Sequence, residues 1–91
     1  MLSPNDNDPV ALALAALAAT ISDERRAQRF IAMTGIGTDE LRSRLADLTL
    51  LAALLRFLEA YEPDLLSVAQ ELGCKPEELV EARAQLEEGT T

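Results

Sequence analysis

The chain has 91 residues and a net charge of −8, and 48% of its residues are hydrophobic, which fits one globular domain and excludes a disordered chain. The excess of acidic side chains disfavours nucleic-acid binding, because such binding relies on Lys and Arg to neutralise phosphates. The absence of His removes the commonest general base and metal ligand, and the lone cysteine cannot form an intrachain disulfide, which favours a reducing compartment.

The first helix is predicted from Pro9 to about Thr20, since proline in a first turn loses no hydrogen bond. Its expected buried stripe is Val10, Leu14, Leu17 and Ile21. Residues 1–8 lack periodicity and are predicted to form a disordered tail. That tail has no Lys or Arg, and the apolar run is too short to span a bilayer, so we interpret the run as a buried helix of a cytoplasmic protein and not as a signal peptide.

Two short helices are predicted next. Ser22 is the expected N-cap of a helix over about residues 23–34, and Gly35 is expected to end it. The expected buried residues are Ala27, Phe30, Ile31 and Met33, and the arginines expected in solvent are Arg25, Arg26 and Arg29. Thr38 is the expected cap of a third helix. Its inner face is predicted to be Leu41, Leu45 and Leu48.

Asp47 is expected to cap a helix over about residues 48–61, which has the widest apolar face in the chain and is therefore placed at the centre of the fold. That face is Leu48, Leu50, Leu51, Leu54, Leu55, Phe57, Leu58 and Tyr61. Pro63 begins a fifth helix that Gly73 closes, and Pro76 begins a sixth. Their expected inward faces are Leu65, Val68, Ala69 and Leu72, and then Leu79, Ala82, Arg83 and Leu86.

No stretch alternates with period two over five residues, so no strand is expected. Short connections of a few residues are typical of a helical bundle. We therefore predict an all-α fold, a compact orthogonal bundle of five to six short helices. A single helical domain over residues 9–88 is followed by a frayed C-terminus over residues 89–91.

Two segments invite a DNA-binding interpretation. The "GIG" turn at residues 35–37 has the core of a helix-hairpin-helix module, but Asp39 and Glu40 follow where a phosphate would bind. Residues 65–88 resemble a helix-turn-helix, whose second helix would begin at Pro76. That helix carries Glu77, Glu78, Glu81 and Gln85, with Lys75 and Arg83 as the basic residues nearby. Because this face is acidic, we keep DNA binding through residues 65–88 as the alternative function only.

Residues that could carry catalysis are few. Cys74 follows the glycine that ends a helix, and Lys75 would favour its thiolate, but there is no His to act as its base. Glu77 and Glu81 share a solvated face, and "NDND" at residues 5–8 lacks the glycine and distal glutamate of a calcium loop. We therefore predict no catalytic, cofactor-binding or metal site, no cofactor, and no enzymatic activity.

Apolar surface is the remaining functional feature. A small domain covers a leucine-rich central helix and an alanine-rich first helix poorly, and an uncovered patch would bind a partner, although complete self-burial is the alternative. We hypothesise a non-enzymatic protein-interaction or self-associating module. Its partner would be another protein or a second copy, bound through exposed Leu and Ala side chains, with no membrane contact.

The segments "RFIAMTGIGTDELRSRLAD" and "LLRFLEAYEPDLLSVAQELGCKPEELVEARAQL" together resemble a small bacterial family known as domain of unknown function 3572. The resemblance spans about residues 10–88, and the "TGI" turn with the following "DELR" is its most specific part. It implies a cytoplasmic bacterial protein of about ninety residues, built of helices and without known activity. It brings no catalytic residues to this chain.

Overall fold

The computed structural model describes residues 8–89, and these residues form six helices and no strand, as predicted. In chain order the helices are α1 (Pro9–Ser22), α2 (Glu24–Thr34), α3 (Thr38–Ser43), α4 (Leu48–Glu59), α5 (Glu62–Leu72) and α6 (Pro76–Gly89). The predicted tail over residues 1–8 lies outside the described residues except for Asp8, and the predicted frayed end over residues 89–91 does so except for Gly89.

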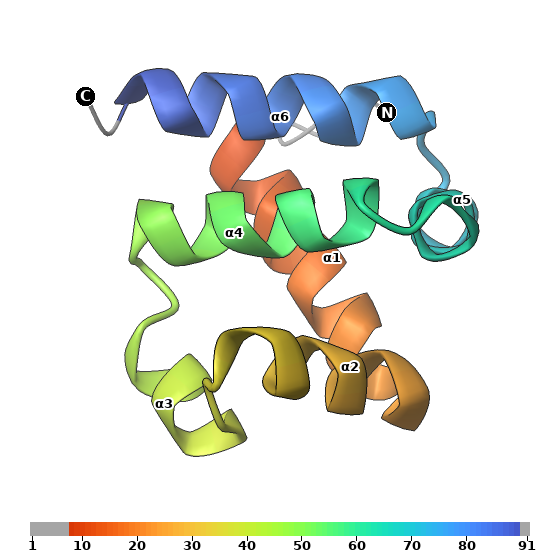
Figure 1. The fold of residues 1–91 in the computed structure, drawn as a ribbon. Coiled ribbons are helices and arrows are strands. Elements are labelled where there is room, and N and C mark those ends of the chain that lie inside the picture. Colours follow the sequence, from red (N-terminus) through yellow and green to blue (C-terminus); the bar gives the residue numbers. More distant parts are fainter. Residues whose placement is uncertain (1–7, 90–91) are drawn as a thin grey trace.

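The helices form an orthogonal bundle, in which α1 and α5 cross the direction of α4 and α6 (Figure 1). α4 and α6 lie side by side and run in opposite directions, while α1 crosses behind both (Figure 1). α5 is seen end-on in the same view and lies across the end of this pair. α2 and α3 lie on the other side of α4 from α6. The Cα radius of gyration is 12.1 Å, so the described helices are compact.

The apolar face of α4 forms the centre of the core, as predicted. Its residues with almost no solvent exposure are Leu50, Leu51, Leu54, Leu55 and Leu58. Phe57 packs edge-to-face on Phe30 of α2, with ring centroids 5.3 Å apart. Tyr61, which was predicted on this face, is 49% exposed. The reason is that α4 ends at Glu59 and Tyr61 takes the extended N-cap position of α5.

The buried face of α1 differs from the predicted stripe. Its buried residues are Ala13, Ala16, Leu17, Ala19 and Thr20. Ile21 is 37% exposed, and Val10 and Leu14 are half-buried. Because the interaxial distance between helices depends on the side chains at the contact, alanines let α1 approach the leucine-rich α4 closely. The buried Thr20 hydroxyl donates to the Ala16 carbonyl at 2.8 Å and is therefore satisfied.

Aspartates start three helices. Asp8, Asp23 and Asp47 each accept hydrogen bonds from backbone N–H groups of the first turn of α1, α2 and α4. The prediction for Asp47 is confirmed, but the prediction that Ser22 caps α2 is wrong. Ser22 is the last residue of α1, and its hydroxyl donates back to the Ala19 carbonyl at 2.9 Å.

The segment from α2 to α4 bends at a left-handed glycine. Gly35 ends α2 with φ +74°, as predicted, whereas Gly37 has φ −79° and takes the N-cap position of α3. Thr38 is thus the first residue of α3, and the prediction that its side chain caps this helix is wrong. α3 ends at Ser43, so Leu45 lies in the following turn and is 42% exposed instead of facing inward.

Candidate functional site

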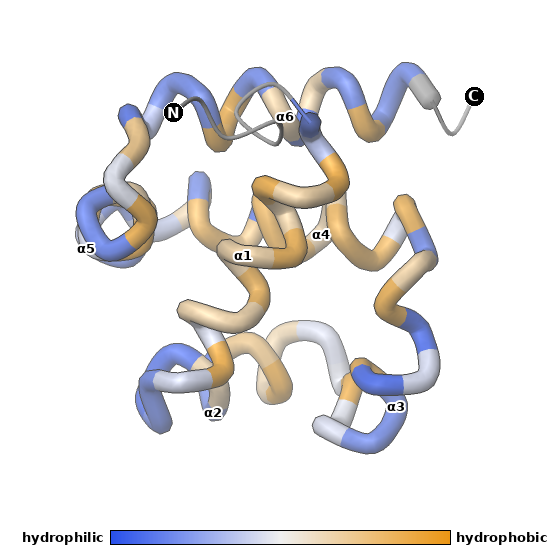
Figure 2. Tube along the Cα trace, turned by 180° about the vertical axis from the view of Figure 1, so that it is seen from behind, coloured by the Kyte–Doolittle hydropathy of each residue, from blue (hydrophilic) through white to orange (hydrophobic). Residues whose placement is uncertain are grey.

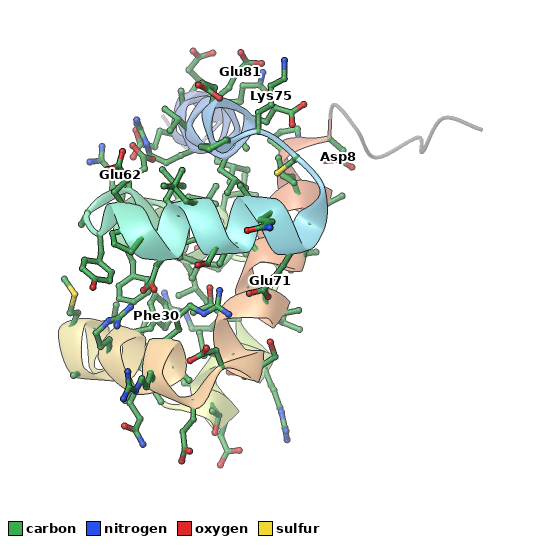
Figure 3. All side chains as sticks on the ribbon, turned by 90° about the vertical axis from the view of Figure 1, so that its right-hand side faces the viewer. Asp8, Phe30, Glu62, Glu71, Lys75 and Glu81 are labelled. Atoms are coloured by element: carbon green, nitrogen blue, oxygen red, sulfur yellow. The ribbon has the colours of Figure 1, made fainter. Side chains whose placement is uncertain are left out.

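Charged side chains join α2 to α5. Arg26 Nη2 lies 2.7 Å from Glu71 Oε2 and 3.5 Å from Asp23 Oδ2. Arg29 forms an ion pair with Asp64. Figure 3 shows Phe30 of α2 and Glu71 of α5 in the layer between these two helices. We call Arg26, Arg29, Asp64 and Glu71 the arginine cluster.

The burial of Arg26 corrects the prediction that all three arginines of α2 lie in solvent. Arg26 is 7% exposed because it precedes Phe30 by one turn and shares its inward face. The Arg26 backbone N–H donates to Asp23 at 3.1 Å, and this hydrogen bond, together with the guanidinium charge, holds the pKa of Asp23 below its ordinary value. Arg26 Nη1 is buried without a hydrogen-bond partner among the described residues. The spacing to Phe30 was the signal in the sequence that could have revealed this burial.

The solvent side of α2 carries a second group of residues. Arg25, Gln28, Arg29 and Ala32 line a shallow hollow, and we call these four residues the α2 outer row. The Arg29 guanidinium lies 4.7 Å from the centre of the Tyr61 ring, within the range of a cation–π contact. Met33, which the sequence predicts to be buried, is 69% exposed and lies in the last turn of α2, one residue before the helix ends at Thr34. This side of α2 therefore places the basic side chains of the α2 outer row next to the exposed apolar side chains of Met33 and Tyr61.

The solvent side of α1 is uncharged. A surface helix normally carries charged residues opposite its core face, but no charged residue occurs in Pro9–Ser22. Its exposed and half-buried outward residues are Ala11, Leu14, Ala15, Ala18, Ile21 and Ser22, and we call them the α1 outer face. Figure 2 shows α1 in front, with colours mostly in the hydrophobic range. The leucines of α4 are buried except for the half-buried Leu48, and the exposed leucines of the described residues are Leu45 and Leu66. The apolar surface of α1 is therefore made of alanines and Ile21, beside the half-buried Leu14.

The two DNA-binding candidates have acidic surroundings. α3 begins directly after Gly37 and carries Asp39 and Glu40 in its first turn. The solvent-exposed residues of α6 include Glu77, Glu78, Glu81, Gln85 and Glu88. Arg83 is held by Glu59 at 2.7 Å and by Glu87 at 2.9 Å. Of the two basic residues in the described residues 65–88, Arg83 is thus paired with glutamates, while Lys75 is exposed and forms no side-chain ion pair with the described residues.

Cys74 lies half-buried against the core, between α5 and α6. Burial raises the pKa of its thiol, and the carboxylate of Glu78 raises it further. Both effects oppose the activation that Lys75 was expected to favour, since the thiolate is the reactive form. Glu77 and Glu81 are both exposed.

Of the four residues in "NDND", Asp8 caps α1 and the other three lie outside the described residues. Across residues 8–89, no three His, Cys, Asp or Glu side chains are grouped so that they could hold a metal ion. No helix in that range is long and apolar enough to cross a membrane.

Comparison with protein families identifies a family that covers most of the chain. Residues 6–89 match the family described as "Protein of unknown function (DUF3572)". A search of curated proteins and a search of solved structures each returned no match.

Proposed function

The chain belongs to the family described as "Protein of unknown function (DUF3572)", and we propose that it is a non-enzymatic protein-interaction module that associates with a second copy through the α1 outer face. The observation that carries this proposal is the absence of charge from the whole of α1 in a protein of net charge −8. Each of the other five helices carries at least one acidic residue, whereas α1 brings only uncharged side chains, mostly alanine, leucine and isoleucine, together.

The shape of α1 supports the same surface. Ala15 and Ala18 lie on its solvent side, and their small side chains permit a close helix–helix approach. Ile21, which is 37% exposed, supplies apolar area that water covers in the monomer, and the half-buried Leu14 beside it also packs against the core. A twofold arrangement uses the same face on both copies, so one uncharged helix is sufficient for the whole contact.

A charge substitution tests the proposal. Ala18→Glu places a carboxylate in the middle of the α1 outer face, and Ala32→Glu places one on another exposed alanine, on α2. Size-exclusion chromatography with light scattering should show a dimer that dissociates on dilution for the wild type and for Ala32→Glu, and a monomer for Ala18→Glu. A wild type that stays monomeric across micromolar concentrations would contradict self-association.

The absence of enzymatic activity is part of the same proposal. The raised pKa of Cys74 and the lack of any His in the chain support it. The exposed glutamates of α6 give no support to DNA binding through residues 65–88. A mobility shift of duplex DNA at low salt that disappears in Lys75→Gln would favour that alternative instead.

A further inference from the structure

We propose that the α2 outer row, together with Tyr61 and Met33, is a second interaction surface, which takes an acidic helical segment of a partner protein. This surface is separate from the α1 outer face and does not depend on self-association.

The charge of the row selects an acidic partner. Arg25, Gln28, Arg29 and Ala32 have the i, i+3, i+4, i+7 spacing of one helical face, and they line one hollow. No carboxylate belongs to this row, although the chain has 16 acidic residues and 8 basic ones. Arg25 is exposed, and none of the ion pairs among the described residues involves it. An incoming carboxylate therefore meets an uncompensated guanidinium there.

The neighbouring Arg29 is held in position before a partner arrives. Asp64 pairs with its guanidinium, and the guanidinium carbon lies 4.7 Å from the centre of the Tyr61 ring. The Arg29 side chain nevertheless remains 42% exposed, so part of its hydrogen-bonding edge faces solvent. Because its rotamer is already fixed, binding loses less side-chain entropy at Arg29 than at a free arginine.

Apolar side chains flank the two arginines. Tyr61 is 49% exposed, and Met33, one helical turn after Arg29, is 69% exposed. Tyr, Met and Arg are the residue types enriched at protein interfaces. The surface thus combines charge that orients a partner with apolar area that stabilises the complex.

The size of the row favours a helix over a polyanion. Arg25 and Arg29 are separated by one helical turn, about 6 Å along the axis, which matches glutamates at i and i+4 of a second helix. A nucleic acid would extend beyond this short row and meet the acidic remainder of a protein with net charge −8. An acidic helix can contact the row alone and place an apolar residue on Met33.

Fluorescence anisotropy with a designed probe tests the inference. The probe is a fluorescein-labelled peptide of repeated Glu-Ala-Ala-Leu units, and its control has glutamine in place of glutamate. The full chain should bind the acidic peptide saturably and the neutral peptide much more weakly. Arg25→Glu and Ala32→Glu should each lower the affinity about tenfold or more, because each adds a repelling carboxylate to the row.

Arg42→Glu is the matched control. Arg42 is another exposed arginine without an ion pair among the described residues, but it lies on α3, outside the hollow. Arg42→Glu changes the net charge by the same amount as Arg25→Glu. It should leave the affinity within about twofold, as expected of a charge outside the contact. Circular dichroism of each variant checks that the fold is kept. Ala18→Glu should bind the peptide like the wild type, even if it abolishes self-association.

Three results would overturn the inference. The first is no binding of the acidic peptide by the wild type. The second is an equal loss in Arg25→Glu and Arg42→Glu, which would show that net charge alone attracts the probe. The third is equally tight binding of a labelled oligothymidylate, which would identify a general anion surface in place of a protein-docking one. In each case the outcome for self-association through α1 is measured independently.

Discussion

The guanidinium of Arg26 in α2 and the carboxylate of Glu71 in α5 lie 2.7 Å apart, and the two side chains differ sharply in exposure, at 8% and 45%. The cation is buried and its partner is half in water. The long stem of Arg26 therefore fills space in the core, whereas water solvates the half-exposed carboxylate of Glu71.

This asymmetry predicts that buried volume at position 26 matters more than charge. Arg26→Ala should lower the free energy of unfolding by about 2 kcal/mol, because it removes buried packing. Arg26→Met should lower it by about 1 kcal/mol or less, since methionine refills the space and removes the unpartnered Nη1. Urea denaturation followed by circular dichroism measures both. Equal losses in the two variants would show that the ion pair is the stabilising element.

The two glycines of the "GIG" turn should respond differently to alanine. Gly35 has φ +74° and open space around its missing Cβ, so Gly35→Ala should destabilise by about 1 kcal/mol through backbone strain alone. Gly37 has φ −79° and equally open space. Gly37→Ala should therefore be close to neutral, because the restriction of the unfolded chain offsets the poorer N-cap preference of alanine at the start of α3. Thermal unfolding of both variants checks the difference, and an equal loss of stability in the two variants would contradict the assignment of backbone strain to Gly35 alone.

Asp47 should make stability depend on pH in the acidic range. A side-chain hydrogen bond from Arg44, aided by backbone N–H groups at the start of α4, lowers the pKa of Asp47 from its ordinary 3.8. A carboxyl group with a lowered folded-state pKa stabilises the protein above its ordinary pKa, and this contribution is lost as the pH falls through the folded-state value. Asp47→Asn keeps a capping oxygen but has no titrating group.

The melting temperature of the wild type should thus exceed that of Asp47→Asn at neutral pH, and the two should converge as the pH falls below 3.8. In an Arg44→Ala background the neutral-pH difference should shrink, since Arg44 is the main cause of the lowered pKa. A difference that persists unchanged at pH values well below 3.8 would assign it to cap geometry and not to charge.

Cys74 should react slowly with alkylating agents. Burial and the nearby Glu78 raise the pKa of the thiol, so less thiolate is present at neutral pH than in a free cysteine. Iodoacetamide should modify the folded protein more slowly than it modifies glutathione, and denaturation in urea should remove the difference. Folded-state alkylation faster than that of glutathione would indicate an activated cysteine and reopen the question of catalysis.

Much of the fold could be predicted because its signals act within one helical turn. Asp47 caps the helix it precedes, and Gly35 and Gly73 end α2 and α5 in the left-handed conformation. The apolar face of α4 is wide enough that its central position could be read directly from the sequence.

The errors occur where a residue depends on distant parts of the chain. The face that α1 buries is chosen by α4 and α6, whose bulky side chains fit its alanines. Arg26 and Glu71 are 45 residues apart, so no local pattern links them. The candidate site shares this limit, because Tyr61 and Arg29 meet only after α2 and α5 have docked.

α1 is the first helix to be synthesised, but it packs mainly against helices that are synthesised later. α1 packs chiefly on α6, α4 and α5, and α6 begins only at Pro76. While the intervening helices are being made, the alanine and leucine side chains of α1 have no completed core to enter. Chaperones bind transiently exposed apolar surface of this kind. A chain that ends at Gly73 should therefore bind a hydrophobic dye and be cleaved readily by proteases, and the addition of α6 should suppress both.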